Sequence, residues 1–217
     1  MAITLLTLLH VLVLVYWLGG DLGAFYGSNF MVDPKRTVVE RRMALTILNN
    51  IDMAPRTMLI LALPTGLALA WVKGWLDLPT YVPVLVGVAS LGWLVLAWAV
   101  HLNHGGGAAI KRIDIAIRWV VLIALYGFGL AGFFKAIELP LFIALKMIVL
   151  ATCISLGLVV RRQLVPLFPA IREMIATGPT PQTDATIAQV NSRARVSVVT
   201  LWLLLLVAAW LGIATPV

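Results

Sequence analysis

Six long apolar runs alternate with shorter polar segments along the chain of 217 residues. A helix needs about 20 mostly apolar residues to cross the hydrocarbon layer of a membrane, and each run approaches that length. The sequence therefore predicts an all-α, polytopic membrane bundle of six spanning helices. Their approximate limits are residues 2–20, 53–72, 81–100, 119–134, 139–160 and 196–213, and the first and fourth helices have room to extend by a turn or more.

The basic residues alternate between the polar connections in a pattern that indicates topology. In chain order the five connections hold 4, 1, 3, 1 and 5 Lys and Arg residues. Loops rich in Lys and Arg stay in the cytoplasm, so we expect the first, third and fifth connections there and both termini on the non-cytoplasmic side. The rich connections hold Lys35, Arg36, Arg41 and Arg42, then Lys111, Arg112 and Arg118, then Arg161, Arg162, Arg172, Arg193 and Arg195, whereas the other two hold Lys73 and Lys135.

Composition supports one integral membrane bundle over residues 1–217, because 62% of the residues are hydrophobic and only 12% are charged. The first run lacks a basic leader and is longer than a signal-peptide core, so we expect it to be a retained span. The net charge of +7 forms no continuous basic helix or arm, which argues against nucleic acid as a partner and for the lipid bilayer. We expect a bacterial cytoplasmic (inner) membrane protein.

The longest cytoplasmic loop covers about residues 161–195. Gly178-Pro179-Thr180-Pro181 interrupts it, and Thr183 or Asp184 is placed to cap a helix that continues into the last span.

His10 is the histidine that lies well inside a span. On a helix it shares one stripe with Trp17 and Asp21, seven and eleven residues later, so the stripe is predicted to face the interior. Polar groups inside membranes tend to mark cofactors or proton paths. An imidazole within a helical bundle suits haem b, with His10 as the iron ligand; a histidine that only bonds to a neighbouring helix remains the alternative.

Two cations, Arg56 and Lys146, lie inside apolar runs, where a charge is costly. Lys146 is about 10 Å and His10 about 12 Å from the ends at which their helices begin, so both are predicted at one depth. Arg56 follows Asp52 by four residues, which fits an internal ion pair or a clamp on a carboxylate such as a haem propionate.

His101 and His104 share a face at the end of the third span, just before Gly105-Gly106-Gly107. The pair fits a second haem, a metal or haem propionates, and equally a polar, solvated helix end. Their depth differs from that of His10 by more than about 10 Å, which makes one haem shared by His10 and His101 unfavourable.

Small residues in the first span indicate close packing. Gly19, Gly23 and Gly27 form a double small-xxx-small pattern that lets another helix approach, within the bundle or in a homo-oligomer. In addition, Trp17-Leu18-Gly19-Gly20 in the first span is similar to Tyr126-Gly127-Phe128-Gly129 in the fourth, which suggests two related three-helix halves.

Three groups of short motifs are spread over a match of about half of the chain: Leu9-His10-Val11 with Trp17-Leu18-Gly19-Gly20; Glu40-Arg41-Arg42-Met43 with Arg56 and Pro64-Thr65-Gly66-Leu67; and Leu145-Lys146-Met147-Ile148-Val149-Leu150. They resemble the HemJ-type protoporphyrinogen oxidases and the related copper-resistance-D-like membrane proteins. The resemblance implies haem b bound through His10 and a role for Lys146 in activity. That family has fewer spans, and the His101/His104 pair has no counterpart in it.

Three functions follow as hypotheses. The first is a haem-b-binding redox protein, an oxidoreductase that passes electrons between a small donor, such as a protoporphyrinogen-like molecule, and quinone or a partner enzyme. Its site would comprise His10, Trp17, Arg56, Lys146, His101 and His104, with Lys146 and Arg56 serving carboxylates or proton transfer. The second is a transporter for a metal or small anion, and the third is a membrane anchor or assembly subunit.

The topology is tested by labelling single cysteine substitutions from outside intact cells. We expect reagents to reach positions near Lys73 and Lys135 and to miss positions near Lys35 and Arg172, because only the weakly basic connections should face outward. The reverse labelling pattern would refute the orientation.

Overall fold

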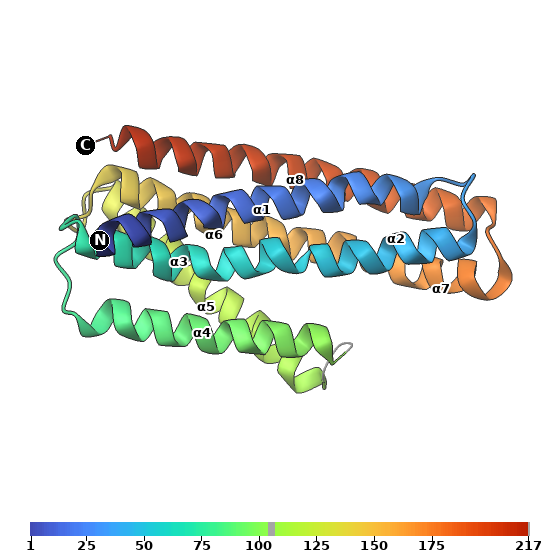
Figure 1. The fold of residues 1–217 in the computed structure, drawn as a ribbon, viewed down its shortest axis with the longest axis horizontal. Coiled ribbons are helices and arrows are strands. Elements are labelled where there is room, and N and C mark those ends of the chain that lie inside the picture. Colours follow the sequence, from blue (N-terminus) through green and yellow to red (C-terminus); the bar gives the residue numbers. More distant parts are fainter. Residues whose placement is uncertain (104–106, 217) are drawn as a thin grey trace.

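The computed structural model describes residues 1–103 and 107–216, and within them the chain is all-helical. The helices are α1 (Ala2–Val32), α2 (Val38–Ile51), α3 (Met53–Val72), α4 (Tyr81–Leu102), α5 (Ala108–Phe133), α6 (Leu141–Gln163), α7 (Leu167–Thr177) and α8 (Pro181–Ala214). Six helical segments are long and apolar enough to cross a membrane, which confirms the six predicted spans. Both termini lie at one end of the bundle, here called the terminal end, and the other end, which carries α7, is called the basic end (Figure 1).

The six spans form a closed ring. In order around it, α1 packs on α3, α3 on α4, α4 on α5, α5 on α6, α6 on α8, and α8 again on α1. All six contribute to one buried core, so side chains fill the centre of the ring. The core residues are Val13, Trp17, Leu59, Ile60, Trp93, Ala97, Leu122, Leu125, Ala151, Cys153, Ile154, Leu201 and Leu205.

The ring consists of two halves of three helices, α1–α3–α4 and α5–α6–α8, each packed in chain order. A glycine lets the first two spans of each half cross closely. A Cβ atom on Gly20 would lie 2.7 Å from Pro55 Cδ, and one on Gly129 would lie 2.8 Å from Ile148 Cγ1. These glycines are the fourth residues of the two similar sequence motifs. Because α1 and α5 run in opposite directions (Figure 1), the halves have inverted orientations.

The basic end carries a second layer outside the ring. With 31 and 34 residues, α1 and α8 are about 46 and 51 Å long, well beyond the hydrocarbon thickness of about 30 Å. Figure 1 shows them continuing past α4 toward α2 and α7. A second apolar cluster joins α1, α7 and α8 there, made of Met31, Leu167, Ala170, Ile171, Met174, Ile187 and Val190.

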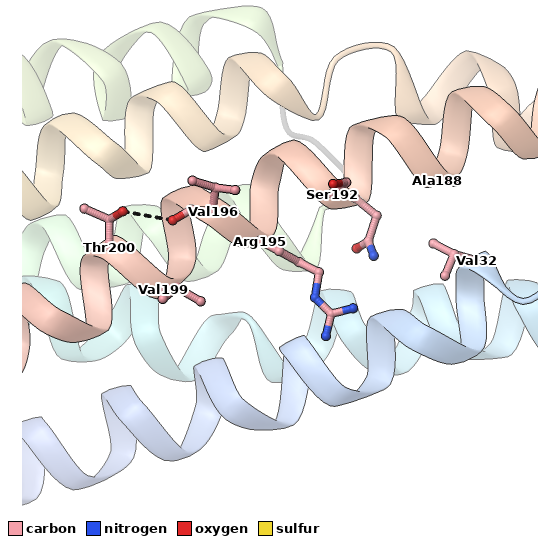
Figure 2. Close-up of a pocket in the computed structure, with 8 residues that line it drawn as sticks. Val32, Ala188, Ser192, Arg195, Val196, Val199 and Thr200 are labelled. Atoms are coloured by element: carbon pink, nitrogen blue, oxygen red, sulfur yellow. Dashed lines mark hydrogen bonds between the residues drawn. The ribbon is translucent and has the colours of Figure 1, made fainter.

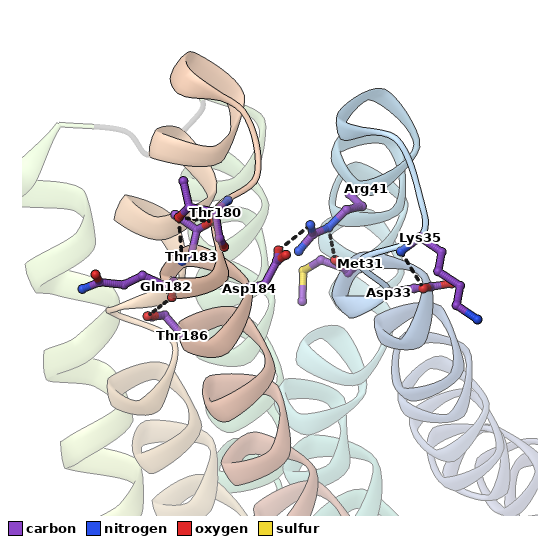
Figure 3. Close-up of polar contacts among 9 residues, drawn as sticks. All are labelled: Met31, Asp33, Lys35, Arg41, Thr180, Gln182, Thr183, Asp184 and Thr186. Atoms are coloured by element: carbon purple, nitrogen blue, oxygen red, sulfur yellow. Dashed lines mark hydrogen bonds and ion pairs between the residues drawn. The ribbon is translucent and has the colours of Figure 1, made fainter.

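Arg41 fixes α2 in this layer. Its guanidinium is 1% exposed, donates to Asp184 at 2.7 Å and to the Met31 carbonyl at 2.8 Å, and so connects α2 to α8 and α1 (Figure 3). The sequence placed Arg41 in the polar connection after the first span; it lies instead in α2 and is buried, and the acid that neutralises it is 143 residues away.

The last helix begins as a proline-led helix should. Thr180 caps it through a capping box with Thr183, Pro181 takes the first turn, and Gly178 adopts a positive φ of 88° just before it. The predicted break at 178–181 is confirmed. The cap is Thr180 rather than Thr183 or Asp184.

The predicted glycine seam is wrong as a packing surface within the bundle. A Cβ on Gly19 or Gly27 would meet nothing within 4 Å, and one on Gly23 would touch only Ile51, at 3.4 Å. The spacing of small residues identifies a face of the helix but not what covers it. The close crossing lies on the adjacent face, at Gly20.

Two variants test this crossing. Gly20→Leu should destabilise the protein by about 1–3 kcal/mol, because α3 cannot move away from the added side chain without disturbing the core. Gly19→Leu, one residue away, should leave stability nearly unchanged. Thermal unfolding in detergent measures both, and equal losses would contradict the assigned crossing.

Candidate functional site

Thr65 determines which nitrogen of His10 carries the proton. His10 Nδ1 lies 2.9 Å from Thr65 Oγ1, and that hydroxyl donates to the Leu61 carbonyl at 2.7 Å. A hydroxyl has one hydrogen, so Thr65 must accept from His10. We infer that Nδ1 is protonated and that the lone pair of the neutral ring is on Nε2, which makes no hydrogen bond with the described residues.

Gly66 gives the His10 ring its space. A Cβ at this position would lie 3.1 Å from His10 Cε1 and 3.7 Å from each ring nitrogen. Any side chain on α3 here would therefore displace the imidazole. Thr65 and Gly66 together form a seat that orients His10, and the sequence signal for it was Pro64-Thr65-Gly66 within an otherwise apolar helix.

Lys146 lies in the same region, on α6. Its amine sits against Gly212 of α8, where a Cβ would be 2.5 Å from Nζ, and its charge is within electrostatic range of the His10 ring. α8, which carries Gly212, packs on both α1 and α6, the helices that carry His10 and Lys146. The predicted common depth of His10 and Lys146 agrees with this arrangement.

The Lys146 amine has no counter-ion among the described residues. It takes part in none of the ion pairs or hydrogen bonds that join them, and another cation, Lys73, is within electrostatic range of it. An unpaired ammonium inside a membrane is costly. This amine is therefore available to an anionic group that enters from outside the chain.

An apolar groove adjoins the His10 seat. It has a volume of about 220 Å³ and lies between α1, α3 and α4. Leu91 on its rim is exposed, so the groove opens toward the lipid. The lining residues are Leu6, Leu61, Pro64, Thr65, Ala68, Gly87, Ser90 and Leu91.

The polar stripe on α1 continues inward below His10. Trp17 is 2% exposed in the core, as predicted, and Asp21 lies beside Trp17 and Trp202. The buried Trp202 indole nitrogen nevertheless makes no hydrogen bond with a described residue, so the Asp21 carboxylate lies outside hydrogen-bonding distance of it.

Arg56 forms an ion pair with Asp52 at the junction of α2 and α3. The internal ion pair, one of the two readings of this residue, is confirmed. Both side chains are about one third exposed, so the pair lies at the margin of the bundle.

His101, at the end of the third span, stands apart from His10. His101 contacts Trp98 edge to face, with ring centroids 6.0 Å apart. It follows the start of α4 by 20 residues, or about 30 Å, against about 12 Å for His10. His104 lies outside the described residues. Within residues 1–103 and 107–216 no three His, Cys, Asp or Glu side chains gather to hold a metal ion.

A buried carboxylate that the sequence did not single out is Asp114, on α5. It is 1% exposed and accepts hydrogen bonds from Trp93 of α4 at 3.0 Å and from Arg118 and Arg161 at 3.1 Å each. It thus joins three helices of the ring. The fourth span extends beyond its approximate limit at residue 119, as the sequence allowed: α5 begins at Ala108 and holds Asp114 and Arg118 as a buried pair four residues apart.

Comparisons with protein-family models, curated proteins and solved structures find no match to this chain.

The Asp114 network yields a stability prediction. Asp114→Asn should destabilise the protein by about 3 kcal/mol, because the buried Arg118 would lose the charge that offsets its burial. Asp33→Asn is the matched control, since the Asp33–Arg36 pair is about one third exposed and should contribute little. Thermal unfolding in detergent measures both, and a loss for Asp33→Asn as large as that for Asp114→Asn would contradict the network's importance.

Proposed function

We propose that this integral membrane protein is a haem-b-binding redox protein of a bacterial cytoplasmic membrane, with His10 as the iron ligand. The observation that carries the proposal is the Thr65 contact, which leaves the lone pair on His10 Nε2. Histidines that bind metals donate their other N–H to an oxygen acceptor, which fixes the ring and raises its basicity. His10 has this arrangement within an apolar bundle.

The residues around His10 fit the rest of such a cofactor. Lys146 supplies an unpaired cation in range of the ring, suited to a propionate carboxylate. Trp17 supplies an apolar floor one layer deeper. Arg56 already forms an ion pair with Asp52. To bind a haem propionate, its guanidinium would have to exchange the Asp52 carboxylate for the propionate carboxylate. Bound haem would supply one-electron redox chemistry, and burial and the histidine ligand would tune its potential.

The apolar groove beside Thr65 supports a partner that is dissolved in the membrane. A quinone, or a protoporphyrinogen-like donor of low polarity, would approach His10 through lipid rather than through water. Lys146 would then hold an acidic group of the donor or move a proton near the site. This is the oxidoreductase activity that the resemblance to the HemJ-type oxidases implies.

The alternative that a structural observation favours is transport of a metal or small anion. Inverted three-helix halves are a common architecture of transporters, with the substrate held near the interface of the halves. His10 and Lys146 come from different halves, and the charge of Lys146 is within electrostatic range of the His10 ring. Ligand binding by purified protein that has no visible chromophore would favour this function.

An anchor or assembly role is supported by the open face at Gly19 and Gly27, which has room for a helix of a partner or of a second copy. Copurification of a stoichiometric partner with a colourless protein would favour it.

The haem proposal is tested with variants of the seat. His10→Ala should abolish haem binding at a normal level of inserted protein, and Thr65→Val should weaken it about ten-fold or more by removing the acceptor for Nδ1. Thr65→Ser should restore it because the hydroxyl returns. Haem per protein is measured by extraction and absorbance.

His101→Ala is the control and should leave haem content unchanged. If His101→Ala empties the protein of haem while His10→Ala retains it, the cofactor lies near the basic end and the proposal for His10 fails.

A further inference from the structure

A groove on the outside of the ring runs between α1 and α8 near the basic end. It has a volume of about 510 Å³. Figure 2 shows its lining, which comes almost entirely from α8, with Val32 of α1 at one end. The other lining residues are Ala188, Asn191, Ser192, Arg195, Val196, Val199 and Thr200.

Arg195 is held in this groove with its charge unpaired. It extends from α8 toward α1 (Figure 2), donates to Asn29 Oδ1 at 2.7 Å, and lies 3.7 Å from the centre of the Phe25 ring. Neither contact is a carboxylate, and Arg195 takes part in no ion pair among the described residues. The guanidinium is therefore positioned in advance, without a counter-ion.

The groove changes from polar to apolar along α8. Asn191 and Ser192 lie one turn before Arg195, and their side chains make no hydrogen bonds with the described residues. After Arg195 along α8, Val196 and Val199 are exposed. The Thr200 hydroxyl donates its hydrogen bond to the Val196 carbonyl at 2.9 Å. Arg195 thus marks the level at which α8 passes from the membrane surface into the apolar layer.

We propose that this groove binds an anionic phospholipid of the cytoplasmic leaflet. Arg195 would bind the phosphate, with Asn191 and Ser192 as further donors, and one acyl chain would lie along Val196 and Val199. The groove is polar at one end and apolar at the other, as a lipid with a charged headgroup and an acyl chain requires. A soluble anion would contact only the polar end of the groove. The basic end is also the side predicted to face the cytoplasm, where anionic lipids attract basic residues.

The test uses the full-length protein in detergent, with phosphatidylglycerol or phosphatidylcholine added in mixed micelles. Thermal stability and native mass spectrometry report binding. We expect phosphatidylglycerol to stabilise the wild type and to remain bound, and Arg195→Gln to bind it about ten-fold more weakly. Arg193→Gln is the matched control, because Arg193 is exposed, carries the same charge and does not line the groove, and it should behave as the wild type.

Equal losses in Arg195→Gln and Arg193→Gln would overturn the proposal, since lipid would then respond only to overall charge. Inorganic phosphate that stabilises as strongly as the lipid would overturn it as well. If Arg195→Gln does not fold, Val199→Trp fills the groove instead, with Val207→Trp on the same helix as control. Lipid lost only in Val199→Trp supports the site, and lipid retained in both variants refutes it.

Discussion

A polar group inside the hydrocarbon layer finds no water to bind, so the protein must satisfy it or accept a large energetic cost. This constraint organises the bundle. Asp114 lies in the core because three donors from three helices surround it. His10 is tolerated because Thr65 Oγ1 accepts a hydrogen bond from its Nδ1–H, and the Thr65 hydroxyl in turn donates to the Leu61 carbonyl. Lys146 is the exception in this set, because its amine makes no hydrogen bond or ion pair with the described residues; the proposed function gives it an anionic partner.

The fold was largely predictable, because hydropathy and the distribution of basic residues are local signals that a spanning helix cannot avoid. The sequence was least informative where charge lies within a helix. Asp114 and Arg118 neutralise one another inside α5, so the helix continues through a stretch whose composition resembles a loop. Arg41 is buried for a similar reason, but its partner Asp184 is distant in the sequence and no spacing rule could find it.

The site was predictable in its depth but not in its chemistry. Helical rise placed His10 and Lys146 in one layer, and in the structure the charge of Lys146 is within electrostatic range of the His10 ring. The contact with Thr65 depends on how α3 crosses α1, which is set by the missing side chains of Gly20 and Gly66. The packing role of a glycine can be assigned only when the helix beside it is known. His10 and Lys146 also come from inverted halves, so the electrostatic interaction between them is a property of the ring and of neither half alone.

One absorption measurement decides whether the His10 seat holds haem b. Wild-type protein purified from haem-sufficient cells should show a Soret band and, after reduction with dithionite, a sharp α band of b-type haem. Protein that is folded and inserted yet shows neither band would contradict the claim.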